Sequence, residues 1–95
     1  MIPENRIPIH PGEILLKEFL KPMDMPRASF AEHIGVPMQQ VDEVIAGRRG
    51  VNAEMAWLFS DAFGTTPQFW LNLQSAHDLA RNRPDKEIRR LQISR

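Results

Sequence analysis

The fold is decided by the stretch SFAEHIGVPMQQVDEVIAGRR, residues 29–49. Each half of it carries apolar residues at helical spacing, so the stretch predicts a helix, a tight turn and a second helix. Ala31 is small enough to let the two helices cross closely, and Val41 packs a branched side chain into that crossing. Gly35 takes the positive φ of the turn at little steric cost. These residues at this spacing are typical of a DNA-binding helix-turn-helix, with a plain helical hairpin as the alternative.

Proline, glycine and capping residues predict further helices on both sides of this stretch. Pro11 opens the first helix, and Asn52 and Thr66 are the N-caps of the last two. The predicted helices span about residues 12–21, 27–34, 37–47, 52–64 and 66–80, which makes this an all-α, five-helix protein. Residues 1–10 form an N-terminal arm, residues 11–81 the helix-turn-helix domain, and residues 82–95 a basic tail that is a short helix, a strand or disordered.

The composition indicates one small globular domain. The chain has 95 residues, of which 42% are hydrophobic, and no cysteine that could form a disulfide or a thiolate metal site. Its 12 basic and 12 acidic residues give zero net charge, which counts mildly against a nucleic-acid binder. No apolar run approaches the length of a membrane span, and the N-terminus lacks the apolar core of a signal peptide. We therefore expect a cytoplasmic protein without membrane contact.

No residue pattern points to catalysis. His10, His33 and His77 lie in three different elements, and none has a second ligand at the spacing of a helical metal site. Ser75, His77 and Asp78 are the residue types of a catalytic triad, but neighbours on one helix cannot align nucleophile, base and orienting group. We therefore expect no enzyme, no metal and no cofactor.

The exposed side of the predicted helix 37–47 is the expected DNA-reading surface. The candidates for base contacts are Met38, Gln39, Gln40 and Glu43. Glutamine pairs bidentately with adenine, methionine touches a thymine methyl group, and glutamate accepts a hydrogen bond from cytosine N4. The candidates for phosphate contacts are Arg27, Arg48 and Arg49. The alternative for both sets is an ordinary solvated surface, and the carboxylates of Asp42 and Glu43 repel phosphate.

The last predicted helix has more apolar surface than packing on one side requires. Its main stripe is widened by large side chains, which favours a second contact surface such as a dimer interface. The predicted interface residues are Trp70, Leu71 and Leu73. The alternative is a small domain that uses all of these side chains in its own core.

Four stretches of the chain resemble the HigA-type, or VapI-type, antitoxins of toxin–antitoxin modules. They are IHPGEILLKEFL (9–20), FAEHIGVP (30–37), VDEVIAGRRGVN (41–52) and TPQFWLNLQSAHDL (66–79). The resemblance implies a five-helix fold of the phage-repressor (Xre) type and a homodimer. It further implies binding to an inverted-repeat operator in the double-stranded DNA upstream of its own operon. It also implies complex formation with a HigB-type toxin, a small ribosome-dependent nuclease that cleaves mRNA.

Three positions depart from the pattern of that family. Pro26 stands where family members often carry Ser or Thr, Asp42 where Asn is frequent, and Ala46 where a basic or amide residue is frequent. The last two make the predicted reading surface less favourable for DNA. Two alternatives to a repressing antitoxin therefore stay open, namely a toxin-binding module with little DNA affinity and a stand-alone helix-turn-helix regulator without a toxin.

Overall fold

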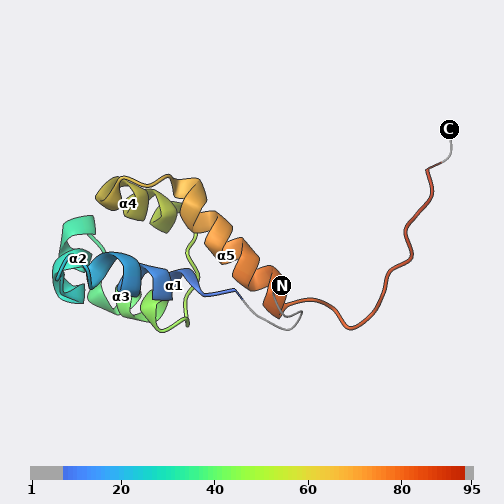
Figure 1. Ribbon diagram of the computed structural model, residues 1–95, viewed down its shortest axis with the longest axis horizontal. Coiled ribbons are helices and arrows are strands. Elements are labelled where there is room, and N and C mark those ends of the chain that lie inside the picture. Colours follow the sequence, from blue (N-terminus) through green and yellow to red (C-terminus); the bar gives the residue numbers. More distant parts are fainter. Residues whose placement is uncertain (1–7, 94–95) are drawn as a thin grey trace.

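The computed structural model describes residues 8–93, which form a small helical domain followed by an extended segment (Figure 1). The helices are α1 (Pro11–Ile14), the π-helix η1 (Leu15–Leu20), α2 (Arg27–Ile34), α3 (Met38–Ile45), α4 (Ala53–Phe63) and α5 (Pro67–Arg81). Because α1 and η1 are continuous, they correspond to the single helix predicted for residues 12–21. The described residues contain no strand, which confirms the all-α, five-helix prediction.

The helix ends follow local capping chemistry. The Asn52 side chain accepts a hydrogen bond from the backbone N–H of Met55 at 2.9 Å, and Thr66 Oγ1 accepts one from Phe69 at 3.1 Å. Gly35 ends α2 in the left-handed region, with φ of 74°. The capping position before α2 is held by Pro26, which supplies no side-chain hydrogen bond. α2 therefore begins without a side-chain N-cap.

The helix-turn-helix crossing between α2 and α3 is packed as the spacing predicts. Ala31 is 2% exposed, Val41 is completely buried, and α2 packs directly against α3. Beyond this crossing, the core contains these buried side chains: Leu15, Leu20, Phe30, Val44, Val51, Met55, Ala56, Phe59 and Trp70. The crossing fixes α3 on the rest of the domain, and one side of α3 stays open to solvent.

Trp70 belongs to this core rather than to an interface. It is completely buried within its own chain, its ring centroid lies 5.0 Å from that of Phe59, and its Nε1 donates to Thr65 Oγ1 at 2.8 Å. The prediction of Trp70 as a dimer contact is therefore wrong, because this side chain has no surface left for a second chain. Leu71 and Leu73 are half-buried against the same core.

The start of α1 is attached to α5 through two histidines. His10 Nδ1 accepts a hydrogen bond from the backbone N–H of Gly12 at 2.9 Å, so this imidazole caps α1. The rings of His10 and His77 meet edge to face, with centroids 5.0 Å apart. His77 Nδ1 in turn donates to the carbonyl oxygen of Pro8 at 2.7 Å, since a carbonyl can only accept. Of the predicted arm, residues 1–7 lie outside the described residues.

We expect the His10 cap to make stability depend on pH. Burial, and next the charge of His77, lower the pKa of His10 from its ordinary value of 6.5; Arg81 also lowers it, and Asp78 raises it. The unfolded chain thus binds the proton more readily. The stabilisation is complete above pH 6.5 and is lost as the pH falls toward the lower folded-state pKa.

Thermal melts at pH 7.5 and pH 5.5 measure this effect. The variant His10→Asn keeps a capping acceptor that does not titrate, so its melting temperature should fall less on acidification than that of the wild type. The variant His10→Ala removes the cap and should cost about 1 kcal/mol at pH 7.5. Wild type and His10→Asn with parallel pH profiles would contradict the assignment.

The segment after α5 leads away from the helical domain (Figure 1). Residues 82–93 form neither helix nor strand, and residues 94–95 lie outside the described part. Its three large apolar side chains are exposed, namely Ile88, Leu91 and Ile93. Residues 82–93 therefore show neither the short helix nor the strand that were two of the forms expected for the tail.

Candidate nucleic-acid interface

Helix α3 presents one side to the core and the other to solvent. Val41 and Val44 are completely buried, whereas Met38 is 48% exposed and Gln39 is exposed beside it. Pro37 occupies the N-cap position, so α3 begins one residue later than predicted. Met38 and Gln39 in the first turn of α3 are therefore in the position from which a recognition helix contacts base edges.

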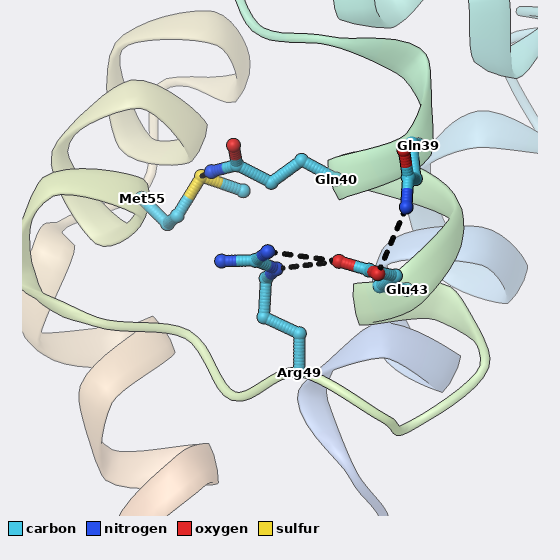
Figure 2. A network of polar contacts seen from close by, with 5 residues as sticks. All are labelled: Gln39, Gln40, Glu43, Arg49 and Met55. Atoms are coloured by element: carbon cyan, nitrogen blue, oxygen red, sulfur yellow. Dashed lines mark hydrogen bonds and ion pairs between the residues drawn. The ribbon is translucent and has the colours of Figure 1, made fainter.

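The two glutamines of this turn differ in direction. Gln40 is half-buried, and its Nε2 donates to the Sδ atom of Met55 on α4 at 3.1 Å (Figure 2). Gln39 lies on the exposed side and donates to Glu43 Oε2 at 3.4 Å, a long and therefore weak hydrogen bond. Gln39 is thus available for a base edge, whereas Gln40 must first leave Met55. Base contact by either residue stays a prediction.

Glu43 holds one of the predicted phosphate-binding arginines. Both Nε and Nη2 of Arg49, which lies in the loop after α3, are 2.9 Å from Glu43 Oε1 (Figure 2). The hydrogen bond from Arg49 holds the pKa of the Glu43 carboxyl below its ordinary value, with a smaller contribution from Gln39. The carboxylate is therefore charged at neutral pH and is already occupied by a guanidinium group.

A second pair joins α3 to the start of α2. Arg27 Nη1 lies 3.4 Å from Asp42 Oδ1, with both side chains partly exposed. Arg48 differs from Arg27 and Arg49, because no carboxylate among residues 8–93 lies within 4.0 Å of its side-chain nitrogens. Sequence reasoning identified Asp42 and Glu43 as a source of repulsion for phosphate. It missed that each of them neutralises an arginine at the edge of the same surface.

The loop after α3, which carries Arg48 and Arg49, is positioned by α5. Gln74 Oε1 accepts a hydrogen bond from the backbone N–H of Val51 at 2.7 Å, and the Gln74 amide also lies against Gly50. Gln74 thereby fixes the loop between α3 and α4, and with it the backbone position of Arg48 and Arg49. Sequence reasoning missed Gln74, because an isolated glutamine on an amphipathic helix carries no local signal of such a contact.

The described residues show no arrangement that requires another kind of site. No three His, Asp or Glu side chains within residues 8–93 converge as metal ligands. No helix in that part of the chain has the length and hydropathy needed to cross a membrane. Ser75, His77 and Asp78 lie on one helix, as the sequence predicts. The candidate site is the exposed side of α3, because Met38 and Gln39 are open to solvent there and Arg27 and Arg49 are paired to carboxylates of the same helix.

Known proteins share this architecture over most of the chain. A helix-turn-helix family model matches residues 16–70. The chain is 42% identical over 88 residues to "Antitoxin HigA-1" of Vibrio cholerae, covering 90% of this chain and 82% of that protein. Among solved structures, it resembles "antitoxin GraA in complex with its operator", with TM-score 0.76, 44% identity, and 85% and 82% of the two chains covered. It also resembles "Pseudomonas aeruginosa antitoxin HigA with higBA promoter", with TM-score 0.76, 43% identity, and 78% and 80% covered.

Proposed function

The chain belongs to the HigA-type helix-turn-helix antitoxin family, and on that premise we propose that it is a dimeric repressor of its own operon. In this role α3 enters the major groove of an inverted-repeat operator, and the protein also neutralises a HigB-type mRNA-cleaving toxin by forming a complex with it. The protein acts by binding and performs no catalysis.

The likeness to an antitoxin solved in complex with its operator supports this proposal most directly. The chain matches an antitoxin in complex with its operator at 44% identity over 85% of its length, and its α3 presents Met38 and Gln39 on the open side of a closely packed crossing. Gln39 is the first candidate for base readout, with Met38, Gln40 and Glu43 beside it. Arg48 and Arg49 lie just beyond the C-terminus of α3, in a loop from which they can bind phosphates on either side of the groove.

The dimer is part of the proposal because one copy of α3 contacts only one half-site. Two copies should occupy successive major grooves about 34 Å apart. With Trp70 in the core, the large apolar side chains left exposed on α5 are Phe69 and Leu79, at 39% and 75%. The half-buried Leu71 and Leu73 stay proposed interface residues, now together with these two.

A second candidate function is a toxin-binding module with little DNA affinity. The pairs Arg27–Asp42 and Arg49–Glu43 favour it, because they neutralise two of the three arginines near the reading surface. Arg48, which pairs with no carboxylate of residues 8–93, and the exposed Gln39 favour the repressor. We therefore expect specific binding to one operator and low affinity for other DNA.

Titration of the protein with two duplexes at several salt concentrations tests the proposal. One duplex carries the inverted repeat upstream of the gene, and the other carries the same bases in scrambled order. Gln39→Ala should cost about 1–3 kcal/mol on the operator and leave binding to the scrambled duplex nearly unchanged. Arg48→Gln should weaken binding to both duplexes and make the dependence of log K on log salt shallower by about 0.9 for each of the two bound chains.

A matched control is Gln68→Ala, since Gln68 is an exposed glutamine on α5. This variant should bind both duplexes like the wild type. The stoichiometry should be two chains per inverted repeat. Equal affinity of the wild type for both duplexes would reject the repressor, and the toxin-binding module would take its place. The toxin is tested separately, by co-purification with the product of the adjoining gene and by the loss of its mRNA cleavage in the complex.

A further inference from the structure

The reading surface carries a chain of three polar side chains that joins base readout to phosphate binding. Gln39 lies at the start of α3, Glu43 one turn later, and Arg49 in the following loop (Figure 2). The Gln39 amide and the Arg49 guanidinium bond to different oxygens of the Glu43 carboxylate, at 3.4 Å and 2.9 Å. One carboxylate thus holds both a predicted base-reading side chain and a predicted phosphate-binding side chain.

Both contacts of this carboxylate can be exchanged. The Glu43 and Arg49 side chains are 26% and 47% exposed, and ion pairs with such access to water are weak and screened by salt. A DNA phosphate is a strong acceptor for arginine, and it competes with Glu43 for the same donors. Arg49 therefore contacts the backbone of a DNA only where the free energy gained with the DNA exceeds that of the Glu43–Arg49 pair.

We infer that Glu43 is a specificity-determining residue that holds Arg49 away from phosphates until α3 is seated on its operator. On the operator, Gln39 turns from Glu43 to a base edge and Arg49 exchanges Glu43 for a phosphate, while Glu43 accepts a hydrogen bond from a base donor such as cytosine N4, which replaces the broken pair. On other DNA the base contact is missing, so Arg49 stays paired. This inference rests on the proposed function and explains how a chain with zero net charge discriminates among sequences.

The test compares three single variants on the operator and scrambled duplexes. Glu43→Gln removes the charge that holds Arg49. Glu43→Asp keeps the charge but shortens the side chain, so that the pair with Arg49 is weakened without a change in net charge. Glu18→Gln is the control for charge alone, because Glu18 is an exposed carboxylate on η1, outside the helix-turn-helix.

Glu43→Gln should tighten binding to the scrambled duplex by about fivefold and steepen the dependence of log K on log salt by about 0.9 for each bound chain. On the operator Glu43→Gln also removes the contact of Glu43 with a base, so its effect there should be smaller and the ratio of operator affinity to scrambled affinity should fall. Glu43→Asp should change the ratio in the same direction, whereas Glu18→Gln should leave it unchanged. In an Arg49→Gln background, Glu43→Gln should change binding to the scrambled duplex no more than Glu18→Gln does.

Circular dichroism melts of each variant establish that it is folded before it is titrated. If Glu43→Gln and Glu18→Gln raise scrambled binding equally, or if the effect of Glu43→Gln persists without Arg49, the inference is wrong and the repressor proposal stands. If the wild type itself fails to prefer the operator, the proposed function is what fails.

Discussion

Replacing Gly12 with alanine is expected to cost about 3 kcal/mol of unfolding free energy or more, the upper end for overpacking. Gly12 is the point at which α1 meets α3. A Cβ atom there would overlap the carbonyl oxygen of Val44 and would stand 2.6 Å from its carbonyl carbon and 2.9 Å from Ile45 Cα. All three are backbone atoms, so no rotamer change relieves the overlap and the two helices must move apart.

Urea or thermal denaturation measures this cost, with Gly50→Ala as the matched control. The atoms nearest to a Cβ at Gly50 would be those of the Gln74 amide, at 3.2 Å, the end of a side chain that can shift by a few tenths of an ångström. Gly50→Ala should therefore be much milder. Alanine is the better helix former, so intrinsic propensity favours Gly12→Ala and cannot account for a loss. A Gly12→Ala protein as stable as the wild type would show that α1 does not lie this close to α3.

Trp70→Ala is expected to destabilise the domain by about 3–5 kcal/mol. Trp70 has no exposed surface and packs against a cluster of aromatic rings, with centroids 5.0 Å away for Phe59 and 5.3 Å away for Phe19. The truncation leaves a large cavity and removes the hydrogen bond to Thr65. In a domain of this size such a loss lowers the melting temperature by at least about 12 °C.

Melts at several protein concentrations identify the origin of this loss. A core residue destabilises every chain alike, so the difference between Trp70→Ala and the wild type should not depend on concentration. A residue buried only in a dimer would give a difference that changes with concentration, because dissociation is linked to unfolding. The control is Trp57→Ala on α4, the same substitution at a side chain that is 59% exposed, and it should change stability little.

The helices and the helix-turn-helix were predictable because their determinants are local. Asn52 and Thr66 bond to backbone N–H groups three residues away, and Gly35 ends α2 through its own φ. Ala31 and Val41 lie ten residues apart, on two helices joined by one short turn, so their contact follows from that turn. The exception is η1, in which Lys21 N–H bonds to Leu16 O and not to the residue four positions back. Nothing in the residue types of that segment indicates this change of pitch.

The sequence by itself therefore determined the helical architecture, the crossing of α2 on α3 and the residue types on the reading surface. Only the tertiary structure decided which of those residues are free to act. Arg27 and Asp42 are 15 positions apart, as are Gln40 and Met55, so their pairing depends on how α3 lies against α2 and α4. For the same reason Trp70 is a core residue and Gly12 a helix contact. Local periodicity shows that a helix has an apolar side, but only the packed arrangement of all the helices determines which side chains that side buries.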